Sequence, residues 1–286
     1  MASNLALTAV KDRGGLNGFG NIFRMANHEW WGTRAWLVQF VIWLLLVNGA
    51  MTAAVLSTPK PGSARAEAQA QAQAQAGKAA GSDADLAATA LTLFFMLGSM
   101  GPAFGVIILA QDALIQERQA GTVAWVLSKP VSRLSFILSK FAADAIGVLV
   151  TMVLLQGLAA YLVCRLAVGV SLPVFGFLAA LGLLFLHLLF YLALSYMLGS
   201  LSRSRGPVIA IPILFIFAYN MHGVLGWVGR ILHWNLTMDL GPTHPSLAIA
   251  LANGLPLPTV APIIGTVALI LIFILIALWR FNREEF

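Results

Sequence analysis

Polar side chains able to do chemistry are few in this 286-residue chain, and most stand alone inside long apolar runs. They include Asp144, His187, Asn220 and His222. Such groups are costly within a bilayer, so each one either serves function or hydrogen-bonds a neighbouring helix. His187, Asn220 and His222 are therefore candidates for lining a transport pathway. Asp144 follows Lys140 by four residues, which permits either a local ion pair or a transport role.

The sequence contains no recognisable catalytic, metal-binding or cofactor-binding set. An intramembrane enzyme needs paired groups such as two aspartates or a Ser–Lys pair at similar depth, and none is found. His233 and His244 lack neighbouring carboxylates or cysteines, so we expect polar residues of the membrane interface rather than metal ligands. Without a Gly-x-x-x-x-Gly-Lys-Ser/Thr phosphate loop, we expect no ATP binding by this chain. The single cysteine, Cys164, can form no intrachain disulfide.

The composition predicts a membrane protein. Hydrophobic residues make up 59% of the chain, charged residues only 10%, and the mean hydropathy is +0.86. A soluble domain has about 25% charged residues, so this chain cannot cover a water-facing surface. The net charge of +6 comes from basic residues scattered beside apolar segments, and we expect no nucleic-acid partner.

Six apolar runs predict an all-α integral membrane fold with six transmembrane helices, because each run is long enough to cross a bilayer. They cover residues 36–56, 86–110, 141–163, 173–200, 207–226 and 260–279. Residues 1–21 are expected to form a flexible N-terminus, and residues 22–286 one transmembrane domain.

Basic residues predict the orientation, because cytoplasmic loops retain Lys and Arg. Five of the 17 fall in the connections expected outside: Lys60, Arg65, Lys78, Arg165 and Arg230. The other twelve fall in the N-terminal segment, the second-to-third connection, the fourth-to-fifth connection and the tail. Both termini are therefore expected in the cytoplasm.

Three segments outside the spans are distinctive. Residues 22–34 place apolar residues on a broad face opposite Arg24 and other polar residues, which predicts an amphipathic interfacial helix. The outer loop 57–85 contains an Ala/Gln tract, for which a helical stalk and a flexible spacer are both open. The outer loop 227–259 is expected to contain short helices resting on the membrane surface, with tryptophans at the interface.

The cytoplasmic connection 111–135 carries the strongest signal. It predicts an extension of the second span, a break at Gly121, a short helix through Trp125 and Leu127, and a stop at Pro130.

Two runs of this connection resemble the signature of type-2 ABC transporter permeases, a glutamate and a Gly-Thr pair followed by a Ser-x-Pro-Val-Ser-Arg stretch. The first run contains Glu117, Arg118, Gly121 and Thr122, and the second is Ser128-Lys129-Pro130-Val131-Ser132-Arg133. The interfacial helix of that family commonly has a basic residue before a glutamate. His28-Glu29 stands there in this chain, with histidine in the basic position.

The resemblance implies one permease subunit with an N-terminal elbow helix and a cytoplasmic coupling helix. Its implied partners are a separate ABC ATPase, which would hold ATP and Mg, and a second permease chain, identical or homologous. Export is the implied direction, and a bacterial or archaeal inner membrane is the implied location. The implied docking residues are Glu117, Arg118, Gly121, Thr122, Trp125, Leu127, Pro130 and Arg133, with Arg24 and Glu29 on the elbow helix.

A second hypothesis is a membrane anchor or maturation factor that moves no solute. In this case ATPase-driven motion would reach an extracytoplasmic partner protein through the Ala/Gln tract and loop 227–259. The spans themselves carry generic Leu, Ala, Val, Ile and Phe, which specify no substrate.

Overall fold

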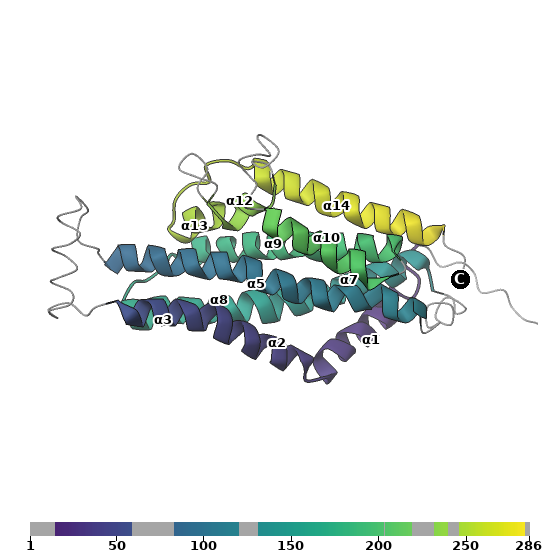
Figure 1. The fold of residues 1–286 in the computed structure, drawn as a ribbon, viewed down its shortest axis with the longest axis horizontal. Helices are drawn as coiled ribbons and strands as arrows, with labels where there is room; N and C mark the ends of the chain where they lie inside the picture. Colours follow the sequence, from purple (N-terminus) through teal and green to yellow (C-terminus); the bar gives the residue numbers. More distant parts are fainter. Residues whose placement is uncertain are drawn as a thin grey trace, which may run out of the picture.

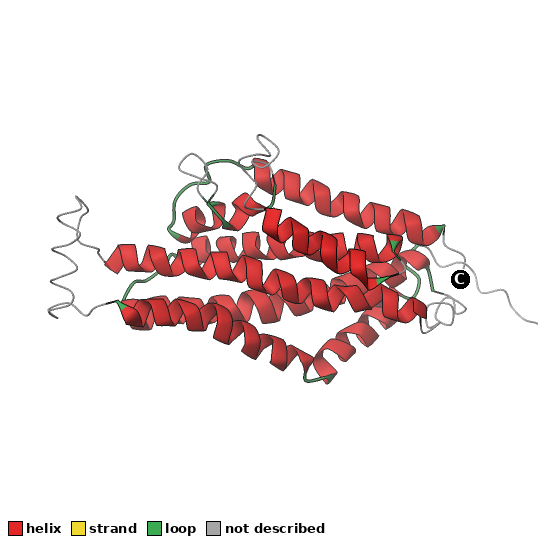
Figure 2. Ribbon diagram, in the orientation of Figure 1, coloured by secondary structure: helices red, strands yellow, loops and turns green. Residues whose placement is uncertain are grey.

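The computed structural model describes residues 15–58, 83–119, 131–202, 204–218, 232–239 and 246–283. All regular structure in these ranges is helical, as Figure 2 shows. The long helices run side by side in one elongated bundle (Figure 1).

Five helical segments are long and apolar enough to cross a membrane, at Trp36–Ser57, Leu86–Gln111, Arg133–Val168, Val174–Leu201 and Ala261–Asn282. Each falls on one of the predicted runs. The prediction of an all-helical, multi-pass membrane protein is therefore confirmed. The remaining run, 207–226, is described only as far as α10 (Arg205–Phe217), and its continuation lies outside the described residues.

Two of the spans are built from α-helical and π-helical pieces. The first consists of α2 (Ala35–Trp43), η1 (Leu44–Asn48) and α3 (Gly49–Ser57). The third consists of α7 (Arg133–Val148), η2 (Leu149–Leu154), α8 (Leu155–Val163) and η3 (Cys164–Val168). The other spans lie within α5 (Asp83–Gln119), α9 (Val174–Leu201) and α14 (Ala261–Asn282). Outside them, the chain forms α1 (Phe19–Gly32), α12 (Trp234–Thr237) and α13 (Leu247–Ala252).

The central element is α9. In its most apolar window 67% of the residues are buried, against 22% in α14 and 28% in the first span. It packs against α5, α14, α13 and α10 and contributes the large buried side chains Phe190, Tyr191 and Tyr196. The surrounding helices keep an apolar outer face, exemplified by Leu45, Ile264 and Leu271. We assign that outer face to lipid.

The short helices of the second outer loop differ from the expectation in one respect. Two short helices, α12 and α13, do lie in 227–259. However, Trp234 is only 1% exposed, and both helices pack against α9 instead of resting on the surface. Tertiary packing of an apolar face, which the sequence could not reveal, accounts for the difference.

The N-terminal helix α1 meets α2 at a sharp angle and returns along α7 (Figure 1). Ile22 is buried, and the indole of Trp30 lies directly over Gly147. A Cβ at position 147 would lie 2.2 Å from Trp30 Cε2, so the missing side chain permits this contact.

We predict that Gly147→Ala destabilises the protein by about 1–3 kcal/mol, because the added methyl overpacks the Trp30 contact. The thermal unfolding midpoint in mild detergent should fall. Gly182→Ala is the matched control, since a Cβ there meets nothing within 4 Å, and it should leave the midpoint unchanged or raise it slightly. Equal midpoints for both variants would contradict the role given to Gly147.

Candidate functional site

The predicted docking residues fall mainly at the far end of α5 and in the segment that follows it. Glu117 and Arg118 belong to the last turn of α5, which runs to Gln119; their side chains are outside the described part of the structure. The following predicted residues lie entirely outside the described ranges: Gly121, Thr122, Trp125, Leu127 and Pro130.

The structure does describe the residues with which this connection ends. They form hydrogen bonds with segments near both ends of the chain. Ser132 caps α7, its Oγ accepting a hydrogen bond from Ser135 N at 3.0 Å. The backbone N–H of Ser132 donates to Asn17 O at 3.1 Å, and its hydroxyl donates to Gly15 O at 2.5 Å. These bonds hold residues 131–133, which we call the loop root, against the start of α1.

A left-handed glycine allows the close approach of the two segments. Gly18, with φ of 82°, precedes α1 and faces Val131. A Cβ there would lie 2.8 Å from Val131 Cγ2, so any larger residue would clash as well as strain the backbone.

Arg133, predicted to contact an ATPase, also binds the last helix of this chain. Its Nη1 donates to Phe281 O and to Asn282 O, both at 3.0 Å. Both carbonyls belong to the last turn of α14, where a cation is favoured by the helix dipole. The loop root is therefore joined to α1, α7 and α14 together.

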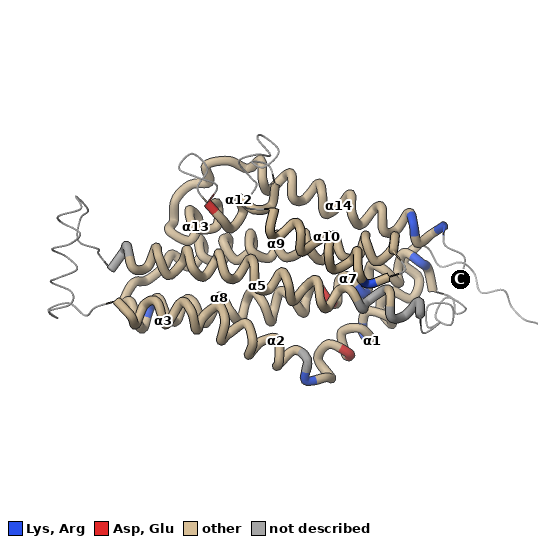
Figure 3. Tube along the Cα trace, viewed as in Figure 1, with Lys and Arg blue, Asp and Glu red and all other residues tan. Residues whose placement is uncertain are grey.

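Positive charge gathers at the same end of the bundle. Figure 3 shows Lys and Arg positions around the start of α7 and the end of α14, and few at the opposite end. Arg133 begins α7, and Arg280 lies in the last turn of α14. Another basic residue, Arg205, begins α10. Arg24 and Glu29, the predicted elbow residues, both lie exposed on α1.

A second polar cluster lies buried where α12 meets α9. His187 Nδ1 is 3.1 Å from His233 O, and His233 Nε2 is 2.9 Å from the hydroxyl of Tyr191. The His233 ring stacks on Phe190, with centroids 3.8 Å apart and planes 16° apart. His187 and His233 are at most 1% exposed, so these contacts fasten residues 232–239 to the central helix. The other two candidates for a pathway, Asn220 and His222, lie outside the described residues.

His233 is held in its neutral form. Burial, and secondarily the neighbouring His187, keep the pKa of His233 well below its usual range. Its Nδ1 has no hydrogen-bond partner among the described residues, so a proton added there would be buried unsatisfied.

Polar side chains also join spans within the membrane. Gln156 accepts from Asn48 Nδ2 at 2.8 Å and donates to Phe40 O at 3.2 Å and Thr151 O at 3.1 Å. It thereby links a π-helical segment of the first span, η1, with one of the third span, η2. Composition and spacing gave no sign of this contact, because the two amides lie 108 residues apart in separate apolar runs.

Asp144 and Lys140 each contact an aromatic side chain. Asp144 Oδ2 accepts a hydrogen bond from Tyr196 at 2.5 Å, which joins α7 to α9. The ammonium of Lys140 lies 5.7 Å from the centroid of the Phe136 ring, a cation–π contact. Within the described ranges, no group of three or more His, Cys, Asp or Glu side chains can hold a metal ion.

We predict that Arg133→Gln loosens the end of α14, because two terminal carbonyls lose a charged donor. Amide hydrogen exchange in the last turn of α14 should become roughly five-fold faster or more. Arg24→Gln, at an exposed position on α1, is the control and should not change that exchange. If both variants exchange like the wild type, Arg133 does not hold this helix end.

The depressed pKa of His233 predicts lower stability in acid. Below about pH 6.5 the unfolded chain binds a proton that folded His233 does not, so unfolding becomes easier by about 1.4 kcal/mol per pH unit. His233→Phe preserves the ring stack and should make the decline in unfolding free energy between about pH 7.5 and about pH 5 shallower. His28→Phe, which changes an exposed histidine of α1, should keep the full decline. Identical slopes for the two variants would rule out His233 as a source of the acid sensitivity.

Comparison with known proteins gives one family. The family described as "Protein of unknown function (DUF2705)" matches residues 71–286. No curated protein matches the chain. The matched region contains α5 to α14 and therefore the loop root, the histidine cluster and Gln156, while α1 and the first span precede it. Since the match covers well over half of the sequence, the chain belongs to the DUF2705 family.

Proposed function

We propose that this chain is the membrane-spanning permease subunit of an ATP-driven transporter of the type-2 ABC class. A separate ATPase subunit would dock on the connection 111–135 and drive substrate movement, with export as the direction. The observation that carries this proposal is the attachment of the loop root to both ends of the chain. A force applied to the loop would reach α1, α7 and α14 at once through Ser132 and Arg133.

The helix that leads into the loop suits the same role. α5 is continuous over 37 residues, about 55 Å at 1.5 Å per residue. Its apolar part ends at Gln111, so its last eight residues project roughly 12 Å further. A rigid projection of this kind transmits displacement better than a flexible loop does.

The finer topology belongs to the proposal as well. α10 would be the start of a sixth span, α1 the interfacial elbow helix, and the positively charged end of the bundle the cytoplasmic end. The angle between α1 and α2 and the exposure of Arg24 and Glu29 support the elbow assignment. A second permease chain, identical or homologous, would complete the pathway.

Orientation is tested by labelling single cysteines with a membrane-impermeant maleimide. The native Cys164 is buried and should not react. Gly121→Cys should be labelled only after the cells are permeabilised, whereas Ala70→Cys should be labelled in intact cells. The reverse pattern would invert the topology and remove the ATPase from reach of the loop.

The coupling role is tested with the separate ABC ATPase that this proposal requires, which we expect to be encoded in a neighbouring gene. We expect no ATPase activity from this chain alone and a stable complex on co-expression. Glu117→Ala or Gly121→Pro should reduce the amount of ATPase that copurifies. Arg283→Gln, at the same end of the bundle but outside the connection, is the control and should retain the complex. Normal assembly and ATP turnover by both loop variants would disprove the docking assignment.

A further inference from the structure

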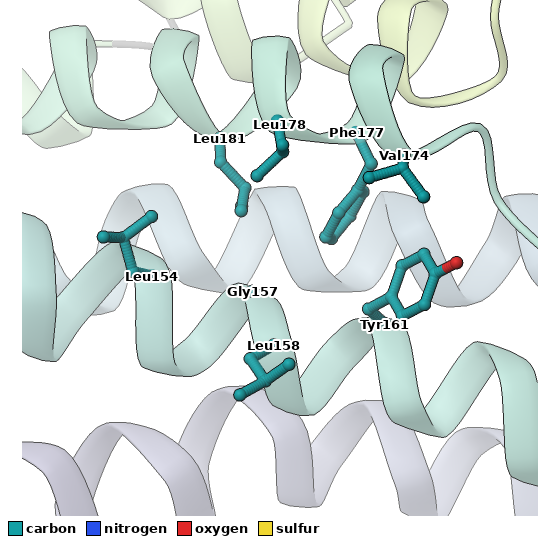
Figure 4. A pocket seen from close by; sticks show the side chains of 8 residues that line it. All are labelled: Leu154, Gly157, Leu158, Tyr161, Val174, Phe177, Leu178 and Leu181. Carbon is teal, nitrogen blue, oxygen red and sulfur yellow. The ribbon is translucent and has the colours of Figure 1, made fainter.

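An apolar groove lies between α8 and the first half of α9, on the side of the bundle away from the loop root. Its volume is about 270 Å³. Figure 4 shows residues of both helices that line it, among them Gly157, Leu158, Tyr161, Phe177, Leu178 and Leu181. Among all the residues that line the groove, the Tyr161 hydroxyl is the one polar side-chain group.

The groove is closed at its floor and open along its side. Phe177 and Leu181 are each 3% exposed, whereas Leu158 is 57% and Leu178 is 50% exposed. Both helices belong to membrane-crossing segments, so the open side faces the hydrocarbon core. In that setting the groove is filled by an apolar chain rather than by water.

Gly157 shapes the groove. A Cβ at this position would lie 2.4 Å from Leu181 Cδ1, so Leu181 occupies the space that any larger side chain would need. The inward position of Leu181 leaves the hollow between Leu158 and Leu178.

The polar end of the groove lies toward the connection 169–173, where α9 has not yet begun. Tyr161 is there, and Arg165 follows it by four residues, about 6 Å further along the same side of the helix. Arg165 is exposed, and no ion pair to it forms within the described part of the chain. A phenol and an exposed guanidinium at the mouth of an apolar groove match a phosphate ester that carries a hydrocarbon chain.

We propose that this groove binds one acyl chain of a membrane phospholipid, with the lipid phosphate between the Tyr161 hydroxyl and the Arg165 guanidinium. The dimensions agree with this occupant. Leu154 lies seven residues before Tyr161, about 10 Å deeper, which is within one leaflet of the roughly 30 Å hydrocarbon core. The volume is just below the range of about 300–1,000 Å³ typical of small-molecule pockets, so a single slender chain fits better than a bulky ligand. The site is independent of the proposed transport function.

The test uses the full chain in phosphatidylglycerol vesicles that contain a phosphatidylglycerol probe with a photoreactive diazirine in its acyl chain. After irradiation, the labelled peptides are identified by mass spectrometry. Adducts should concentrate on residues 154–161 and 174–181, above the level on the exposed face of α14 at Ile264 and Leu271. Equal labelling of α14 and the groove would show only bulk lipid contact and overturn the proposal.

Two variants test the binding of the acyl chain and the binding of the phosphate separately. Leu178→Trp fills the groove and should reduce labelling to the level seen on α14, whereas Leu162→Trp, a 44% exposed position of α8 outside the groove, should not. Arg165→Gln should reduce phosphatidylglycerol labelling about five-fold, the effect of one cation near an anionic headgroup. It should leave labelling by a phosphate-free diacylglycerol probe unchanged.

Three results would overturn the assignment. Leu178→Trp and Leu162→Trp behaving alike would remove the groove from the binding site. An equal effect of Arg165→Gln on both probes would remove the phosphate. Disulfide-linked dimers formed through Leu178→Cys in the same vesicles would assign the groove to a second copy of this chain instead of lipid.

Discussion

The whole bundle depends on the burial of α9. A helix in lipid gains little by exchanging one apolar environment for another, so close packing and a few polar contacts must hold neighbouring helices together. α9 supplies both. Its aromatic rings fill the centre, Tyr196 hydrogen-bonds Asp144 of α7, and His187 with Tyr191 holds His233. The third span and the α12 segment are therefore each joined to the central helix by polar side chains.

The two ends of the bundle are organised differently. At the basic end, the loop root joins α1, α7 and α14 through backbone carbonyls and charged donors. At the other end, α12 and α13 close over α9 with mostly apolar and aromatic buried side chains, which surround the polar contacts of His233. The first kind of contact is polar and directional and suits the transmission of force. The second kind excludes water from the core of the bundle.

The spans could be predicted from sequence because they depend on a one-dimensional property, the length of an apolar run. Five predicted runs agree with described spans to within a few residues, apart from the third, which begins eight residues earlier at Arg133. The earlier start has a local cause, the cap that Ser132 provides. The partners of polar side chains could not be predicted in this way. Gln156 meets Asn48 across 108 residues of sequence, and Arg133 meets Phe281 across 148.

Only part of the candidate site could be predicted from the sequence, again because the partners of its side chains lie far away along the chain. The resemblance selected Arg133, and the structure adds its contacts with the carbonyls of α14. His187 was selected as an isolated polar residue in a span, but nothing in the sequence indicated that it would meet His233. A pattern of residue types identifies which side chains are unusual in their surroundings, while their partners depend on how the helices pack.

The amide of Gln156 has a mechanical consequence. Its three hydrogen bonds reach the first span, through Asn48 and Phe40, and its own span, through Thr151. Sliding these two spans past each other would break both bonds to the first span together in a medium that offers no replacement. We therefore expect the first and third spans to move as one rigid lever, with α1 carried along by the Trp30–Gly147 contact. Any motion of this lever relative to α9 would have to break the hydrogen bond between Tyr196 and Asp144.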